Sequence, residues 1–219
     1  MVDVRLPRAE QVKVRPAGTE ELTTRDRIVE VAARLFHQYG YHATTMRQIA
    51  DGVGIKAASL YNHFASKQEL LTTISYGTMC EMLASVQTAL AGVRDPGEQL
   101  RAFVRAHTTY CIAERYRARV ADELRDLDPE NLLDVVAMRD RYEAVLRGIL
   151  AALDASSGGA VGDVTLVANA IGTMASQVST WYRDDGRLSP DEIADVYAAL
   201  ALGAALAGVS QSGARARPR

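Results

Sequence analysis

Apolar side chains recur every three to four residues along most of the chain, and no long stretch alternates apolar and polar residues. Residues 45–48, 66–69 and 189–192 read Thr-Met-Arg-Gln, Ser-Lys-Gln-Glu and Ser-Pro-Asp-Glu, and each has the spacing of a helix capping box. The pattern predicts an all-α chain of about nine helices. The expected helices are Thr24–Tyr39, Met46–Val53, Lys56–His63, Lys67–Ala91, Pro96–Glu114, Arg117–Leu124, Pro129–Leu153, Asp163–Arg183 and Pro190–Val209.

The first three expected helices form a small N-terminal group over residues 23–70. Gly40 stands where the first helix must stop, and Gly54 lies in the short link between the second and the third. Glycine adopts the left-handed backbone that a sharp turn between helices needs. Two helices of about two turns each, joined around a glycine, match a helix-turn-helix. Residues 1–22 lack such periodicity and are expected to form a flexible tail.

The third expected helix, residues 56–63, has few residues with core character. Only Leu60 and the following Phe64 are large and fully apolar, and the helix starts with the small residues Ala57 and Ala58. An exposed helix that begins with small side chains can enter the major groove of DNA. The expected partner of this domain is therefore double-stranded DNA.

The distribution of charge agrees with this interpretation, although the surplus is small. The chain has 25 Lys and Arg against 27 Asp and Glu, a net charge of −2. Residues 23–70 nevertheless carry a net charge of +2, and residues 71–219 carry −4. A basic N-terminal segment on an otherwise acidic chain favours phosphate binding by that segment. The slightly negative net charge of the whole chain argues against a protein that binds nucleic acid nonspecifically.

Residues 24–72 resemble the tetracycline-repressor (TetR) family. The resemblance rests on Thr44-Thr-Met-Arg-Gln-Ile-Ala50, Gly52-Val-Gly-Ile55, Leu60-Tyr-Asn-His-Phe64 and Ser66-Lys-Gln-Glu-Leu70. Where the family has Ser or Thr after the turn, this chain has Lys56-Ala-Ala58, so its third helix lacks the usual hydroxyl cap. By matching position, the resemblance implies that phosphates are met by Thr45, Arg47, Lys56, Tyr61, His63 and Lys67, and that base edges are approached by Ala57, Ala58, Ser59 and Asn62.

Structural roles compete with some of these assignments. Thr45 serves equally well as a plain helix cap, and Arg47 is spaced to pair with Asp51 on the same helix face.

Residues 71–209 are expected to form a helical ligand-binding and dimerisation domain, followed by a flexible tail over 210–219. The expected helices 163–183 and 190–209 are rich in small and apolar residues, which allow close helix packing. Members of the resembled family pair through these two helices, which predicts a homodimer. The alternative is that both helices only fill the core of the monomer.

A small-molecule effector is expected within this second domain. Methionines and aromatic residues at helical spacing are more often core than pocket, and both interpretations stay open. Segments around residues 121–129, 139–142 and 181–183 resemble a branch of repressors of fatty-acid and sterol breakdown, which implies an acyl-CoA effector whose phosphates would meet Arg139, Arg141 or Arg183. The candidates for lining the pocket are Phe103, His107, Tyr110, Met138, Tyr142, Met174 and Trp181.

Other classes of protein receive little support. No phosphate-binding glycine loop, His-Glu-x-x-His or Cys-x-x-Cys occurs, so no cofactor, metal site or catalytic residue is expected. Cys111 and His107 are the only pair with nucleophile and base chemistry, and they lie in an apolar stretch. The two cysteines form no disulfide framework, and no run is long enough to span a membrane, so a cytoplasmic protein is expected. The alternatives are a drug-responsive repressor of an efflux system and, with less support, a helical enzyme.

Overall fold

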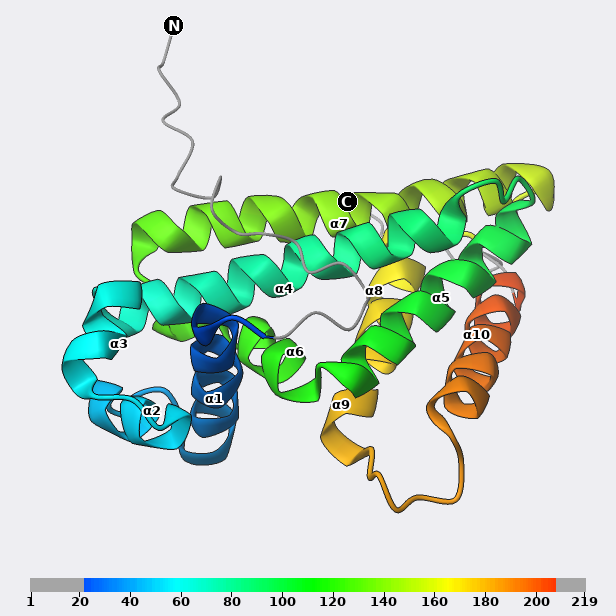
Figure 1. Cartoon of the computed structure of the whole chain (residues 1–219). Coiled ribbons are helices and arrows are strands. Elements are labelled where there is room, and N and C mark those ends of the chain that lie inside the picture. Colours follow the sequence, from blue (N-terminus) through cyan, green and yellow to red (C-terminus); the bar gives the residue numbers. More distant parts are fainter. Residues whose placement is uncertain (1–21, 208–219) are drawn as a thin grey trace, which may run out of the picture. The chain divides into compact units, whose positions relative to one another are not determined.

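The computed structural model describes residues 22–207, in which all regular secondary structure is helical. The tails predicted at residues 1–22 and 210–219 lie outside this part of the chain, apart from Leu22. The elements, labelled in Figure 1, are α1 (Thr24–Tyr39), α2 (Met46–Val53), α3 (Ala57–His63), α4 (Lys67–Leu90), α5 (Pro96–Ala113), α6 (Arg115–Asp122), the 3-10 helix η2 (Leu124–Asp126), α7 (Pro129–Ser156), α8 (Val164–Ser176), α9 (Val178–Trp181) and α10 (Pro190–Leu206).

The prediction of an all-α fold is confirmed, and the helix expected over Asp163–Arg183 is divided at Gln177. Two hydroxyls bond the backbone at the break: Ser179 donates to the carbonyl of Ser176, and Thr180 donates to the carbonyl of Gln177. Ser and Thr that bond the preceding turn bend a helix. Periodicity continues across such a bend, so the sequence pattern did not reveal it. The end predicted at Val209 lies outside the described residues.

The described chain forms two compact units. The first comprises residues 22–81 and 114–140, and the second comprises residues 82–113 and 141–207. The boundary falls within α4 and within α7, and each unit is considered by itself below. The first unit is larger than the predicted DNA-binding domain of residues 23–70, because it includes α6, η2 and the beginning of α7.

The core of the first unit is made by one face from each of its helices. Ile28, Phe36, Ile49 and Leu60 come from α1 to α3, and Ile74 comes from α4; all are at most 4% exposed. α1 packs against both α2 and α6. The three short helices are therefore held on a common apolar centre, which leaves their outer faces free for contact with a partner.

In the second unit, α5 is central. It packs along α10 and also contacts α8 and α9 (Figure 1). Its buried residues follow helical spacing, from Leu100 and Phe103 through Val104 to Cys111 and Ile112. Among the described residues, no helix is long and apolar enough to cross a bilayer.

Candidate functional site

The turn between α2 and α3 has the geometry that the sequence predicts. Thr45 caps α2: its Oγ1 accepts from the Gln48 backbone N–H at 3.2 Å, and the Gln48 side chain accepts from the Thr45 N–H at 2.8 Å. Gly54 ends the helix at φ 80° and ψ 31°, and its N–H bonds the carbonyl of Ala50 at 3.0 Å. A side chain at position 54 would strain this left-handed backbone. The cap role of Thr45 is thus present in the structure, and its phosphate contact stays a prediction.

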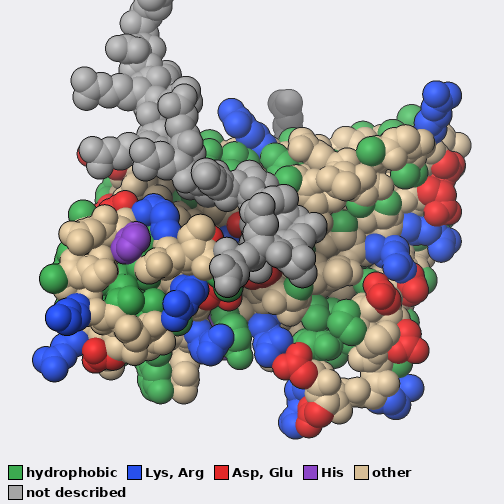
Figure 2. All heavy atoms as spheres, in the orientation of Figure 1, with side chains coloured by type: hydrophobic (Ala, Val, Ile, Leu, Met, Phe, Trp, Pro, Cys, Tyr) green, Lys and Arg blue, Asp and Glu red, His purple; other side chains and the backbone are tan. Residues whose placement is uncertain are grey.

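α3 faces outward along most of its surface. Leu60 is its only buried residue, Tyr61 is 53% exposed, and Lys56 provides no side-chain cap, as expected from the missing hydroxyl. Figure 2 shows more Lys and Arg than Asp and Glu side chains over the region of α1 to α3. Of the other predicted contacts, Thr45, Arg47, Lys56, Ala57, Ala58 and Asn62 are exposed, and Ser59 and His63 are half-buried.

Two arginines of α1 hold the ends of the other two helices. Arg27 donates to the carbonyl of Val53 at 2.9 Å, at the end of α2. Arg25 donates to the carbonyl of His63 at 2.6 Å, at the end of α3, and lies 3.9 Å over the Phe64 ring. Cations at helix C-termini satisfy carbonyls that have no partner within the helix. Sequence reasoning missed this role, because both arginines looked like part of a general basic surplus.

Lys67 has a different environment from the one expected of a phosphate ligand. Its ammonium donates to the carbonyls of Tyr41 at 2.7 Å and Thr44 at 2.8 Å, with that of His42 at 3.4 Å, and lies 4.3 Å from the centre of the Tyr41 ring. An ammonium has three donors, so the carbonyls of the α1–α2 turn occupy all of them. Burial lowers the pKa of Lys67, and Asp126 opposes that shift. Lys67 therefore fastens the turn, and a phosphate would have to displace one of these carbonyls.

The next residue on α4, Gln68, holds a different segment. Its side-chain amide donates to the carbonyl of Asp126 and accepts from the N–H of Asp128 at 3.2 Å. His42 in the α1–α2 turn lies 3.0 Å from the Asp126 carboxylate. Consecutive side chains of α4 thus connect the helix-turn-helix to the segment that follows α6.

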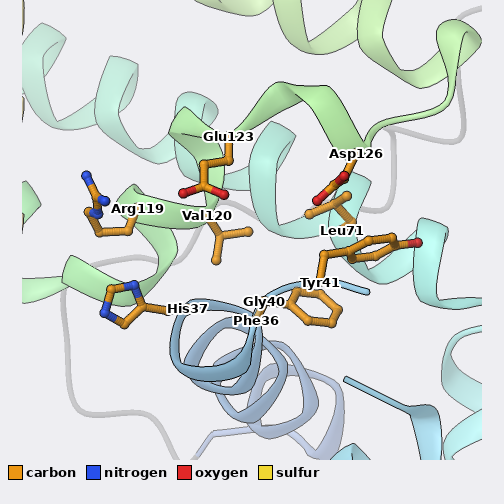
Figure 3. A pocket seen from close by; sticks show the side chains of 9 residues that line it. All are labelled: Phe36, His37, Gly40, Tyr41, Leu71, Arg119, Val120, Glu123 and Asp126. Atoms are coloured by element: carbon orange, nitrogen blue, oxygen red, sulfur yellow. The ribbon is translucent and has the colours of Figure 1, made fainter. Parts of the chain in front are cut away.

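Figure 3 shows the small pocket beside this connection, with a volume of about 150 Å³. The aromatic rings of Phe36 and Tyr41 and the side chain of Leu71 lie on its apolar side. Glu123 and Arg119 approach it from the end of α6. The junction of α1, α4 and α6 therefore includes a small hollow with an apolar side and a charged side.

The second unit contains a buried polar cluster. His107 lies 2.6 Å from the Tyr142 hydroxyl through Nδ1 and 3.1 Å from the Ser176 hydroxyl through Nε2. The Phe103 and Tyr142 rings lie 5.3 Å apart. Burial lowers the pKa of His107 to about 4 and raises that of Tyr142 well above its ordinary value. Both groups are therefore neutral at physiological pH.

The predicted pocket residues divide between these surroundings. Phe103, His107 and Tyr142 come together, and Tyr110 and Met174 are half-buried in the same unit. Met138 is buried but belongs to the first unit. Trp181 is 49% exposed, with its ring 6.4 Å from that of Tyr197, at a shallow hollow of about 290 Å³. Their contact with a ligand stays a prediction for all seven.

The arginines expected to meet CoA phosphates differ in their availability. Arg139 donates to the Asp122 carboxylate at 3.2 Å and to the carbonyl of Ala121 at 3.1 Å. Arg183 forms a bidentate ion pair with Asp185, in which two guanidinium N–H groups donate to the two carboxylate oxygens, both at 2.9 Å. Arg141 is exposed. Binding of phosphate by Arg139 or Arg183 would therefore require an existing ion pair to open.

The two helices predicted to form the dimer have both buried and exposed apolar residues. Ala168, Ile171 and Ala175 of α8 are buried within their own unit. The neighbouring faces stay exposed: Leu166 of α8 is 60% exposed and Leu200 of α10 is 53% exposed. Both helices predicted to form the dimer therefore carry exposed apolar residues, and their contact with a second copy stays a prediction.

The pair Cys111 and His107 offers no accessible nucleophile. The sulfur lies 3.5 Å from Nε2, but the cysteine is 2% exposed and the histidine 4% exposed. A thiol that is buried in this way is out of reach of an external substrate. No group of three or more potential metal ligands occurs within residues 22–207.

An outward-facing helix-turn-helix joined to a larger helical unit defines a DNA-binding transcriptional regulator. Residues 28–74 match the model of the bacterial regulatory proteins of the tetR family, and residues 93–205 match that of the tetracyclin repressor-like C-terminal domain. The chain belongs to the TetR family.

Similarity to individual relatives extends over most of the chain. The transcriptional repressor KstR2 of Mycobacterium tuberculosis is 28% identical over 199 residues, which cover 86% of this chain and 94% of the repressor. The structure of the TetR-family regulator PfmR from Thermus thermophilus matches with a TM-score of 0.73 and 36% identity, covering 84% of this chain and all of PfmR. AibR, solved in complex with isovaleryl coenzyme A and operator DNA, matches with a TM-score of 0.69 and 27% identity over 85% of this chain and all of AibR.

Proposed function

We propose that this chain is a cytoplasmic repressor that binds a near-palindromic operator as a homodimer and is released by an acyl-CoA. The observation that carries the DNA-binding part is the outward face of α3, of which Leu60 is the only buried residue. The end of α3 is held by Arg25 and the end of α2 by Arg27, so the helix pair meets DNA as a preformed unit. Preorganisation reduces the entropic cost of binding.

Within this interface the contacts divide into two kinds. Phosphate contacts fix the position of the protein and carry no sequence information, whereas base contacts select the sequence. Asn62 is exposed on α3 and suits an adenine edge, which presents one donor and one acceptor. We assign phosphate contacts to Thr45, Arg47, Lys56, Tyr61 and His63, and base-edge contacts to Ala57, Ala58, Ser59 and Asn62.

The homodimer is supported by the exposed apolar faces of α8 and α10. Leu166, Val196 and Leu200 are 60%, 49% and 53% exposed, and the small residues Ala199 and Gly203 lie on the same face of α10. A soluble monomer rarely leaves such residues in one patch. A symmetric pair places two recognition helices on two half-sites, about 34–36 Å or a multiple of that distance apart.

Two observations support an acyl-CoA as the effector. One is the apolar surface of the second unit with its neutral cluster of His107, Tyr142 and Ser176, which can meet a polar atom of an otherwise apolar ligand. The other is similarity to AibR, which was solved with isovaleryl coenzyme A.

The adjacent residues Lys67 and Gln68 of α4 offer a route by which effector binding could change DNA binding. Lys67 holds the α1–α2 turn and Gln68 holds residues 126 and 128, so a displacement of residues 126–128 would reach the helix-turn-helix through two consecutive residues of α4. We expect the dimer to have two shapes, of which one fits the operator and the other binds the effector more tightly. A ligand changes the equilibrium between them only by its differential affinity, which is about 1–3 kcal/mol for typical coupled sites.

The proposal is tested with DNA selected from genomic fragments by the purified protein. Fluorescence anisotropy on a selected duplex and on a scrambled duplex measures specificity, and sedimentation measures the mass of the complex. Titration with acyl-CoAs, the free acids and cationic drugs then measures release. Release by CoA esters alone supports the proposal. Release by a drug cation, with no ester active, would instead indicate a drug-responsive repressor, and binding of a monomer to one half-site would exclude the dimeric mode.

A further inference from the structure

The hollow at the junction of α1, α4 and α6 has room for a small molecule (Figure 3). Its volume is about 150 Å³, and all of its lining residues belong to the first unit. A buried cavity of that volume holds a benzene ring, so a hollow with an exposed rim has room for a ligand of about six to nine non-hydrogen atoms. The effector proposed above is assigned to the second unit, so this hollow is a candidate for a different ligand.

The floor of the hollow is apolar. Phe36, Leu71 and Val120 are each at most 6% exposed. The Tyr41 ring lies 5.3 Å from the Phe36 ring, in an edge-to-face arrangement. Methyl or methylene groups of a ligand would leave water on this floor, which favours binding of an aliphatic segment.

One end of the hollow has cationic chemistry. Figure 3 shows Arg119 and His37 on one side of Val120 and Asp126 on the other. Within residues 22–207, the Arg119 guanidinium makes neither a hydrogen bond nor an ion pair, since the neighbouring acid Asp122 is bonded to Arg139 at 3.2 Å. A guanidinium presents its N–H groups in a geometry that matches a carboxylate. This end therefore suits the carboxylate of a ligand.

The other end has acidic chemistry. The Asp126 side chain is only 18% exposed, and one of its oxygens lies 3.0 Å from His42, which leaves the second oxygen without a hydrogen bond to the described residues. Glu123, which Figure 3 shows between the two ends, makes no hydrogen bond or ion pair in the same part of the chain. The Lys67 ammonium senses Asp126 but is bonded to carbonyls of the α1–α2 turn. This end therefore suits the ammonium of a ligand.

We infer that this hollow binds a small aliphatic amino acid in its zwitterionic form. A ligand with one charge would satisfy one end and meet a like charge at the other. A zwitterion places its carboxylate at Arg119 and its ammonium at Glu123 and Asp126, with its hydrocarbon part on the floor. The two charges are adjacent in an α-amino acid and separated in an ω-amino acid, and both have this chemistry. The inference does not depend on the acyl-CoA effector and gives the DNA-binding unit a ligand of its own.

Isothermal titration calorimetry on the full chain tests the ligand class. L-leucine and 6-aminohexanoate each have about nine non-hydrogen atoms, for which we expect a Kd of about 0.1–1 mM for the better of the two. Tighter binding of leucine indicates adjacent charges, and tighter binding of 6-aminohexanoate indicates separated charges. Hexanoate and hexylamine each lack one charge and should bind about tenfold more weakly. Equal binding of either single-charge analogue, or no binding of both amino acids at about 10 mM, would overturn the inference.

Two variants locate the site. Arg119→Gln and Glu123→Gln each remove one charge at the hollow and should weaken binding of the better amino acid about tenfold. Both side chains are at least half-exposed or at the rim, so Tm should stay within about 2 °C of the wild type. Arg125→Gln and Glu130→Gln are the matched controls, because both residues are exposed and neither lines the hollow. Wild-type affinity in either hollow variant, or an equal loss in the controls, would show that the amino acid binds elsewhere and would overturn the inference.

Discussion

Replacing Lys67 by methionine separates a structural role from a phosphate contact. The change keeps the apolar stem and removes the bonds to the carbonyls of Tyr41 and Thr44, at 2.7 and 2.8 Å. Hydrogen bonds to charged groups contribute about 1.5–3 kcal/mol each, and these carbonyls regain some hydration, so the expected loss is about 2 kcal/mol in total. For a chain of this size that lowers Tm by about 4–8 °C.

The assay combines thermal unfolding with the salt dependence of operator binding. If Lys67 only fastens the turn, the slope of log affinity against log salt should stay unchanged, because no phosphate contact is lost. Lys56→Met is the matched control: Lys56 is exposed, and its side chain makes no cap bond. That variant should keep its Tm and reduce the salt slope by about one. An unchanged Tm with a reduced slope for Lys67→Met would refute the structural role.

Three further changes have measurable outcomes. Gly54→Ala should cost about 1–2 kcal/mol, because an alanine at φ 80° is strained; equal urea midpoints for both proteins would contradict the assigned turn. The pKa of His107 is about 4 in the folded state, below its ordinary value of 6.5, so the unfolded chain binds more protons between those values and stability should fall as pH drops from 7 to 5, by about 2 kcal/mol. His107→Gln should remove most of this slope in pH-dependent denaturation. Leu200→Asp places a charge on the exposed face of α10 and should convert the dimer to monomers in sedimentation, whereas Arg94→Asp on an exposed loop should not.

The residues of the helix-turn-helix could be identified from the sequence because its determinants are local. The capping box of Thr45 and Gln48 acts within three residues, and the left-handed turn at Gly54 needs only the absence of a side chain. The exposure of α3 also follows from its composition, since Leu60 is nearly alone as a core residue. A pattern of this kind predicts both the fold of the segment and its class of partner.

Tertiary structure decided the roles that depend on residues distant in sequence. Lys67 reaches the carbonyls of Tyr41 and Thr44, and Arg25 reaches that of His63, so both cations bond backbone groups that local spacing does not reveal. The sequence likewise did not determine which face of α8 packs into the core, because small and apolar residues lie on several sides of this helix. Periodicity specifies which residues share a helix face, but only packing determines what that face contacts.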